Sequence, residues 1–284
     1  MSVETRTRIF VGVSLGALVM WVLFGMPQPI LVGFLCLLAW RGWVEYLRIF
    51  DMTPRSLKGI LGLGAVCLAI VDSYFKGIVG IKWIWFFWVL ALFFLVIETM
   101  SFERDKKDKD LSHLLREYTF YFGGLLYIFF LFGFYAPILA KASLSHGQNY
   151  GKGVIFLTLL VVFFSDIAAY FYGRKYGKRP LWPVVSPKKT IEGAYAGLVG
   201  SSMAAAIFTI VWHMLKLDPI PFGKILLFTI FAAPLAQGGD FLESFFKRVS
   251  GVKDSGSLLP GHGGLLDRID GLAFTLPLAY FIFV

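Results

Sequence analysis

Apolar runs of about 20 residues recur along the whole length of this chain and limit what it can fold into. That length is what an α-helix needs to cross a bilayer, and inside lipid only helices and closed barrels satisfy their backbone hydrogen bonds. Charged residues make up 16% of the chain, whereas soluble domains carry about a quarter. We therefore predict an all-α polytopic membrane protein without a sizeable soluble domain.

The hydropathy pattern predicts nine membrane-spanning helices, at residues 9–26, 29–47, 59–75, 79–99, 118–140, 153–172, 191–213, 225–246 and 271–284. The first run is followed by Pro27 and Pro29 instead of a small-residue cleavage site, so we expect a helix and not a signal peptide. The candidate functional residues all lie after about residue 150. We divide the chain into an N-terminal scaffold, residues 1–150 with five helices, and a C-terminal catalytic region, residues 151–284 with four.

Lysine and arginine residues are distributed unevenly between the two sides of this arrangement. Of the 27, 21 fall in the N-terminal segment and around the connections after helices two, four, six and eight. The positive-inside rule then places the N-terminus in the cytoplasm and the C-terminus outside. Two polar segments, residues 174–189 and 240–271, would face the cytoplasm, where nucleotides are available.

The segment from Asp240 to Gly271 gathers acids, bases and glycines between two apolar stretches. Asp240, Glu243 and Lys247 recur at helical spacing and form one polar stripe, which must face protein, water or ligand instead of lipid. Glycines surround His262 and allow the backbone to approach a ligand closely. Acids that hold metal and bases that hold phosphate together indicate phosphoryl chemistry.

A second polar group precedes this segment. Asp166 lies inside a predicted spanning helix, where an acid is a functional hypothesis by default. Thr190 is the predicted N-cap of the next helix, with Glu192 in its first turn. Two lysines directly before that helix terminus suit a polyphosphate. Farther along, Gly238 and Gly239 predict a kink or a break in the helix over 225–246.

The residue types favour a hard metal ion over zinc. Cys36 and Cys67 lie in apolar runs, and none of the four histidines belongs to a Cys/His cluster. Carboxylates near residues 240 and 267–270 could instead converge on Mg²⁺, which takes a few carboxylates with water and phosphate oxygens. His262 is then either a phosphate contact or a residue that shapes the turn, and we favour the phosphate role.

Two patterns resemble the phosphatidate cytidylyltransferases, also called CDP-diacylglycerol synthases. The first reads Ser244-x-x-Lys247-Arg248-x4-Lys253-Asp254-x-Gly256-x3-Pro260-Gly261-His262-Gly263-Gly264-x-x-Asp267-Arg268-x-Asp270. The second reads Asp166-x-x-Ala169-Tyr170-x-x-Gly173-Arg174-x-x-Gly177-Lys178, followed by Ser186-Pro187-Lys188-Lys189-Thr190-x-Glu192-Gly193. The leucine pairs before Pro260 and Asp267 depart slightly from the family's usual spacing. The resemblance covers about residues 165–271, and the first half of the chain is similar only in hydropathy.

The resemblance implies an enzyme that joins CTP and phosphatidic acid to give CDP-diacylglycerol and pyrophosphate with Mg²⁺. The expected metal ligands are Asp240, Asp267 and Asp270. The expected catalytic residues are Asp240, Asp267, Lys188, Lys189 and Arg268. The expected substrate-binding residues are Asp166, Ser186, Thr190, Glu192, Lys247, Arg248, Lys253, Asp254, His262, Gly263 and Gly264. We also expect a second, monovalent cation, a homodimer, a bacterial inner membrane location and no nucleic-acid partner.

Two other functions remain open at this stage. A CTP-dependent polyprenol or lipid-alcohol kinase would use similar groups but transfer the γ-phosphoryl group and release CDP. An ion-coupled transporter would use acids such as Asp166 and Asp240 inside the membrane. The sequence shows no internal repeat, and its charges gather toward one face, which disfavours the transporter.

Overall fold

The computed structural model describes residues 16–76, 111–256 and 263–284, together with Leu258 and isolated residues between 82 and 96. Six helical stretches in this part of the chain are long and apolar enough to cross a membrane. They are α2 (Gln28–Ile49), α3 (Leu57–Lys76), a stretch over Leu115–His146, α8 (Tyr150–Tyr176), α9 (Ile191–Met214) and α10 (Phe222–Val249). The all-α membrane class is therefore confirmed.

The Leu115–His146 stretch combines several elements, namely α5 (Leu111–Phe132), α6 (Tyr135–Pro137), the π-helix η2 (Ile138–Ala142) and α7 (Ser143–His146). The predicted span at 79–99 lies mostly outside the described residues, and the one at 9–26 is described only from Gly16, where an apolar helix ends in the π-helix η1 (Trp21–Gly25). The predicted span at 271–284 is α12 (Leu272–Phe283), which has 12 residues. At 1.5 Å per residue this helix is about 18 Å long, less than the roughly 30 Å core of a bilayer.

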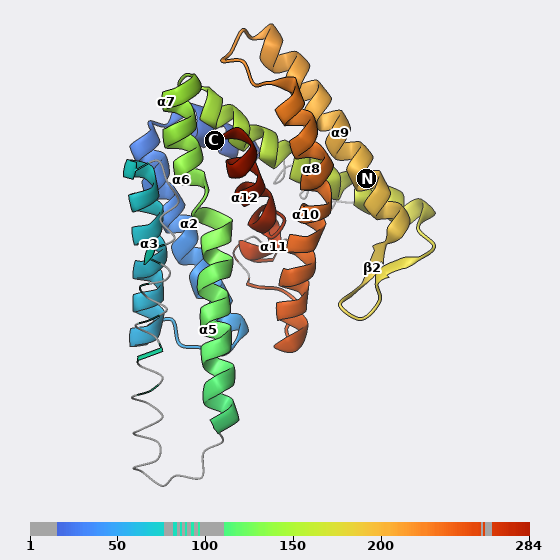
Figure 1. Cartoon of the computed structure of the whole chain (residues 1–284). Helices are drawn as coiled ribbons and strands as arrows, with labels where there is room; N and C mark the ends of the chain where they lie inside the picture. Colours follow the sequence, from blue (N-terminus) through green and yellow to red (C-terminus); the bar gives the residue numbers. More distant parts are fainter. Residues whose placement is uncertain are drawn as a thin grey trace.

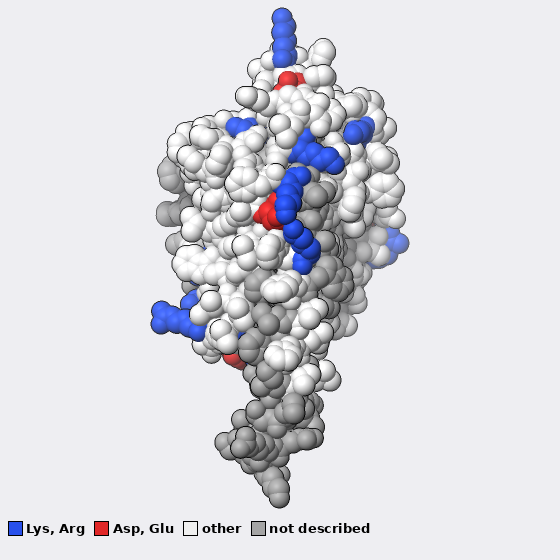
Figure 2. Space-filling model, turned by 60° about the vertical axis from the view of Figure 1, so that its left-hand side comes forward, with Lys and Arg blue, Asp and Glu red and all other residues white. Residues whose placement is uncertain are grey.

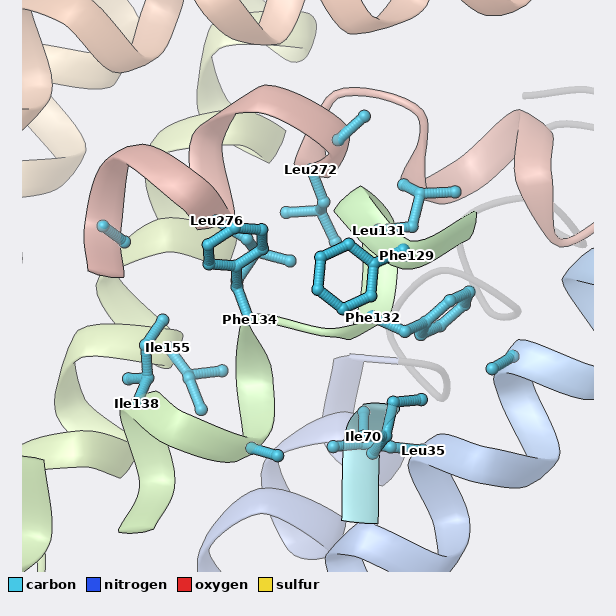
Figure 3. Packing of buried hydrophobic residues seen from close by; sticks show 14 of the residues in the cluster. Leu35, Ile70, Phe129, Leu131, Phe132, Phe134, Ile138, Ile155, Leu272 and Leu276 are labelled. Carbon is cyan, nitrogen blue, oxygen red and sulfur yellow. The ribbon is translucent and has the colours of Figure 1, made fainter. Parts of the chain in front are cut away.

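Helices from both halves of the chain pack together. In Figure 1, α12 and the short α11 (Leu266–Ile269) lie between α5 on one side and α10 on the other, and α12 contacts α5, α8 and α10. The buried core shown in Figure 3 mixes Phe129 and Phe132 of α5 with Leu272 and Leu276 of α12. The functional division at residue 150 remains a prediction, and the hydrophobic core extends across it.

Small residues allow α8 and α9 to pack with their backbones close together. A Cβ atom added at Gly197 would lie 2.8 Å from Ser165 Oγ, and one at Gly200 would lie 2.8 Å from the Phe164 carbonyl oxygen. One added at Gly193 would lie 2.8 Å from the Ala169 carbonyl oxygen. Small residues at such spacing are a common way for helices to associate in lipid, where hydrophobicity alone provides no driving force.

A short β-hairpin connects α8 to α9, a feature that the sequence analysis did not predict. Strands β1 (Pro180–Trp182) and β2 (Ser186–Thr190) pair antiparallel, with Pro180 opposite Thr190 and Trp182 opposite Ser186. The predicted N-cap is confirmed, because Thr190 Oγ1 accepts a hydrogen bond from Gly193 N at 3.1 Å. The hairpin therefore places the two lysines of β2 directly before the start of α9.

Of the two predicted alternatives at Gly238 and Gly239, the break is wrong, because α10 is one helix through both residues, and the kink stays a prediction. Gly239 instead permits a close helix contact. A Cβ atom there would collide with the backbone carbonyl of Asp270, at the junction of α11 and α12. The glycine thus brings the polar end of α10 against the segment that carries Asp267 and Asp270.

The molecular surface suits a lipid environment. On the face shown in Figure 2, most of the described surface is neither basic nor acidic, and charged side chains occupy a few small areas. Large apolar side chains such as Val199, Met203 and Ile207 of α9 are more than half exposed. In a bilayer these exposed side chains would contact acyl chains.

Candidate active site

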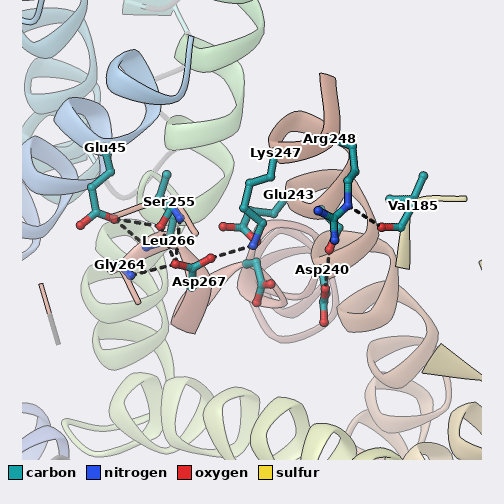
Figure 4. Close-up of polar contacts among 12 residues, drawn as sticks. Glu45, Val185, Asp240, Glu243, Lys247, Arg248, Ser255, Gly264, Leu266 and Asp267 are labelled. Atoms are coloured by element: carbon teal, nitrogen blue, oxygen red, sulfur yellow. Dashed lines mark hydrogen bonds and ion pairs between the residues drawn. The ribbon is translucent and has the colours of Figure 1, made fainter. Parts of the chain in front are cut away.

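Four segments bring the predicted charged residues into one region. These segments are the middle of α8, strand β2, the second half of α10, and the loop that leads from α10 into α11. In Figure 4, Asp267 lies between Glu45 of α2 and Lys247 of α10, while Arg248 points toward Val185 of the hairpin. The two sequence patterns, about 50 to 100 residues apart in the chain, therefore meet in space.

Lys189 of the second pattern forms an ion pair with Asp240 of α10, which lies one helical turn before Ser244, where the first pattern begins. Lys189 Nζ donates to Asp240 Oδ2, and Ser244 Oγ donates to Asp240 Oδ1 at 3.2 Å. The Lys189 ammonium group also lies 5.4 Å from the centre of the Trp182 ring. Both partners of the pair are about a quarter exposed, so water or a ligand can reach them.

Lys247 lies between two carboxylates. Its Nζ is 2.5 Å from Glu243 Oε2, one turn earlier on α10, and 2.7 Å from Asp267 Oδ1 of α11. Glu243 is 1% exposed and has no other hydrogen-bond partner among the described residues. Lys247 therefore neutralises a buried acid and fixes the position of Asp267 at the same time.

Asp267 is held by the loop as well as by Lys247. Its Oδ2 accepts from Ser255 N at 2.9 Å, from Ser255 Oγ at 2.9 Å and from Gly264 N at 2.8 Å. Gly263 has φ +80°, a conformation that favours glycine, and a Cβ atom there would lie 2.6 Å from Asp267 Oδ2. Burial opposes ionisation, but the hydrogen bonds from Lys247, Gly264 and Ser255 outweigh it and hold the Asp267 pKa below its ordinary value.

Asp270 lies in a strongly acidic neighbourhood. Burial, followed by the nearby charges of Asp240, Glu243 and Asp166, raises the pKa of Asp270 well above its ordinary value. Lys189 partly opposes this effect. Asp270 therefore has three other acids close enough to oppose its ionisation and one lysine that favours it.

Mg²⁺ is the metal that the sequence resemblance implies, and the side chains fit it in part. Among the described residues, no group of three or more His, Cys, Asp or Glu side chains is placed to hold a metal ion. Mg²⁺ usually takes only one or two protein carboxylates and completes its shell with water and substrate phosphate oxygens. Both oxygens of Asp240 and both oxygens of Asp267 already accept hydrogen bonds. The assignment of Asp240, Asp267 and Asp270 as ligands therefore remains a prediction.

The remaining predicted residues occupy less central positions. Glu192 accepts from the backbone N–H groups of Lys178 and Arg179 at 3.0 and 3.2 Å, so it stabilises the chain before β1. Arg248 Nε donates to the Val185 carbonyl at 3.2 Å. The exposed side chains are those of Asp166, Lys188, Lys253, Asp254 and Arg268, while Ser186 is half-buried. His262 lies outside the described residues.

Three residues of this region were missed by the sequence analysis as site residues. They are Glu45 of α2, Glu243 of α10 and Ser255 of the loop. Glu243 belongs to the polar stripe on α10, so its spacing already carried a signal. Glu45 gave a weaker signal, because it is the only acid inside the apolar run at 29–47. Its partners in the loop, about 210 and 221 residues away, could not be read from the sequence.

Comparison with known proteins shows the family of the chain. The cytidylyltransferase family matches the chain over residues 6–284. The phosphatidate cytidylyltransferase of Bacillus subtilis (strain 168) is 34% identical over 288 residues, covering 99% of this chain and 98% of the relative. That of Thermotoga maritima is 36% identical over 177 residues, or 62% of this chain and 63% of the relative. With the match extending across both halves, the chain belongs to the cytidylyltransferase family.

Proposed function

We propose that this protein is a phosphatidate cytidylyltransferase, an integral-membrane nucleotidyltransferase of phospholipid biosynthesis that makes CDP-diacylglycerol and pyrophosphate. The observation that carries the proposal is the full-length similarity to the Bacillus subtilis phosphatidate cytidylyltransferase. The paired lysines and carboxylates described above support it, because they offer positive charge for phosphates beside acids for a hard cation. The substrates are CTP and phosphatidic acid.

The reaction is an in-line displacement at the α-phosphorus of CTP. A phosphate oxygen of phosphatidic acid forms a new bond to that phosphorus, and the bond to the bridging oxygen of the β-phosphate breaks. The electron pair leaves with pyrophosphate. The lipid phosphate is ionised near neutral pH, so the reaction needs no strong general base, and catalysis rests on positioning and charge neutralisation.

The lysines of the two ion pairs are the proposed phosphate-binding groups. Lys189 projects from β2 directly before the N-terminus of α9, where the helix dipole also attracts anions. Lys247 forms ion pairs with both Glu243 and Asp267. Lys188, Arg248, Lys253 and Arg268 add positive charge that favours the approach of two anionic substrates.

Asp240, Asp267 and Asp270 are the proposed Mg²⁺ ligands. Bound there, Mg²⁺ would neutralise charge on the phosphate oxygens. A monovalent cation near the same acids is a further proposal. Treatment with EDTA should abolish turnover and added Mg²⁺ should restore it, while replacement of K⁺ and Na⁺ by a bulky organic cation should lower the rate. Full activity after EDTA treatment would contradict the Mg²⁺ proposal.

The proposed topology has nine helical segments in a bacterial inner membrane, with the N-terminus in the cytoplasm and the C-terminus outside. The distribution of lysine and arginine supports this orientation. The active site would then face the cytoplasm, where CTP enters from water and phosphatidic acid enters sideways from the leaflet. A homodimer is proposed without a specific interface.

The test uses purified protein in liposomes with phosphatidic acid, Mg²⁺ and α-labelled CTP. The expected result is label in the lipid phase together with one pyrophosphate for each lipid labelled. A second assay replaces phosphatidic acid with polyprenol. Release of CDP in that assay, with no α-label in the lipid, would instead support the lipid-alcohol kinase. A protein that turns over no nucleotide with either lipid would return the transporter to consideration.

A further inference from the structure

Glu45 is a buried acid in the N-terminal half of the chain that contacts the active-site loop. Its side chain is 1% exposed. Its Oε2 accepts from Leu266 N at 3.1 Å and lies 3.3 Å from Ser255 Oγ, while its Oε1 lies 3.0 Å from Arg41 Nη2. A carboxylate this deeply buried is costly unless it is paired, and Arg41 and the loop together provide its partners.

Two glycines of the loop make room for the Glu45 carboxylate. A Cβ atom at Gly264 would lie 2.5 Å from Glu45 Oε2, and one at Gly256 would lie 3.0 Å from Glu45 Oε1. Neither glycine has a positive φ, so close approach explains them better than backbone conformation. The loop is therefore shaped around the side chain of a residue that belongs to another part of the sequence.

The residues that contact Glu45 are also those that hold Asp267. Ser255 donates to Asp267 through both its backbone N–H and its hydroxyl group, and Gly264 donates through its backbone N–H. Leu266, whose N–H reaches Glu45, directly precedes Asp267 in α11. In Figure 4 these groups form one chain of contacts from Glu45 through the loop to Asp267 and Lys247.

We propose that Glu45 is a positioning residue of the active site, which fixes the loop so that Ser255 and Gly264 orient Asp267. The inference rests on the proposed function, since Asp267 is part of the proposed catalytic group. It assigns a role in turnover to α2, which the sequence analysis placed in the scaffold. Substitution of a residue that orients a catalytic carboxylate typically costs about 10- to 100-fold in activity.

The experiment measures lipid-dependent CTP turnover in liposomes for Glu45→Gln, Ser255→Ala and the double variant. Glu117→Gln is the control, because Glu117 on α5 also forms an ion pair, with Lys58 Nζ at 3.0 Å, and that pair lies away from the loop. Hydrogen exchange of the peptide that spans residues 250–270 is followed in the same proteins. This second measurement needs no activity, so it separates the inference from the proposed function.

We expect Glu45→Gln to lower kcat about 10-fold or more, to leave KM for both substrates within about twofold, and to speed hydrogen exchange in the loop. The double variant should be no slower than the slower single variant within about twofold, because both changes disrupt one chain of contacts. Glu117→Gln should keep its rate and its loop protection.

Three results would overturn the inference. They are wild-type turnover in Glu45→Gln, losses that multiply in the double variant, and unchanged exchange in the loop. If the wild-type protein itself fails to convert CTP and phosphatidic acid, the proposed function fails, and the exchange data still report whether Glu45 orders the loop. If Glu45→Gln does not fold, Glu45→Asp, which keeps the charge but shortens the side chain, must reproduce the kcat loss and the faster exchange in the loop.

Discussion

At the scale of single residues, the two ion pairs assign different tasks to similar groups. Asp240 and Lys189 are partly exposed and come from two separate segments, so substrate can separate them. Asp267 and Lys247 are more deeply buried, and Asp267 also accepts from Ser255 and from the backbone of the loop. The first pair is therefore the more accessible to phosphate, and the second is the more rigid.

Asp267→Asn should lower turnover by about 100-fold or more while the protein still inserts and folds, because the amide retains the volume but loses the charge opposite Lys247. The measurement is initial rate in liposomes together with the thermal midpoint. Asp51→Asn is the control, since Asp51 is exposed and its φ of 56° suits asparagine. Retained activity in Asp267→Asn would contradict the assignment of Asp267 to the catalytic group.

Lys189→Met should reduce turnover more than Lys188→Met does. Lys189 is half-buried and pairs with Asp240, whereas Lys188 is exposed on the same strand. We expect the larger share of the Lys189 effect in KM for CTP, which steady-state kinetics at saturating phosphatidic acid will measure. Equal effects of the two substitutions would mean that β2 provides general positive charge and no specific phosphate contact.

At the scale of secondary-structure elements, the site depends on how closely its helices approach. Glycines set the distance between α8 and α9, and Gly239 sets that between α10 and the Asp270 junction. These contacts fix the relative positions of Asp166, Lys189 and Asp240. Substitutions at these glycines should therefore affect both the stability of the protein and its catalytic activity.

Gly197→Leu should lower the thermal midpoint by several degrees, because a side chain at this position would collide with Ser165 of α8. Overpacking of this kind typically costs about 1–3 kcal/mol. Gly33→Leu is the control, since nothing lies within 4 Å of a Cβ atom added there and the residue is exposed. Differential scanning fluorimetry in detergent will compare them. A Gly197→Leu variant as stable as wild type would show that α8 and α9 can separate without cost.

The sequence predicted the elements better than it predicted their contacts. Hydropathy located the long helices, and the Thr190 cap followed from local hydrogen bonding. Local patterns could not show that Gly239 serves a contact with Asp270 instead of a helix break. Glu45 was missed for the same reason, because its partners are more than 200 residues away. Periodicity records which face of a helix is polar, but it does not record what that face meets.

At the scale of the whole molecule, the described helices form a shared core with one charged region. In Figure 1 the β-hairpin lies where α8 leads into α9, whereas α7 precedes the start of α8, at the opposite end of that helix. Val184 in the hairpin is 88% exposed, and Leu144 in α7 is 87% exposed. Because the two side chains are almost equally exposed, a difference in their labelling would report the side of the membrane on which each lies. A chemical label that cannot cross the membrane can therefore distinguish the two sides.

In intact cells, Leu144→Cys should react with a membrane-impermeant maleimide, and Val184→Cys should react only after permeabilisation. Cys36 and Cys67 are replaced by alanine in both variants so that the new thiol is the only one. Each variant is compared with this cysteine-free parent. The opposite labelling pattern would place the hairpin, and with it the proposed active site, outside the cell.

The contact between Glu45 and the loop also affects how the protein is made. Its partners Ser255 and Leu266 follow it by 210 and 221 residues, so at about 5–20 residues per second they are synthesised roughly 10–40 s later. During that interval the acid is in or near the membrane without the loop. Arg41, one helical turn away at 3.0 Å, is available as a counter-ion from the start. The Arg41–Glu45 pair can therefore protect the nascent α2 from an uncompensated charge until the C-terminal segments arrive.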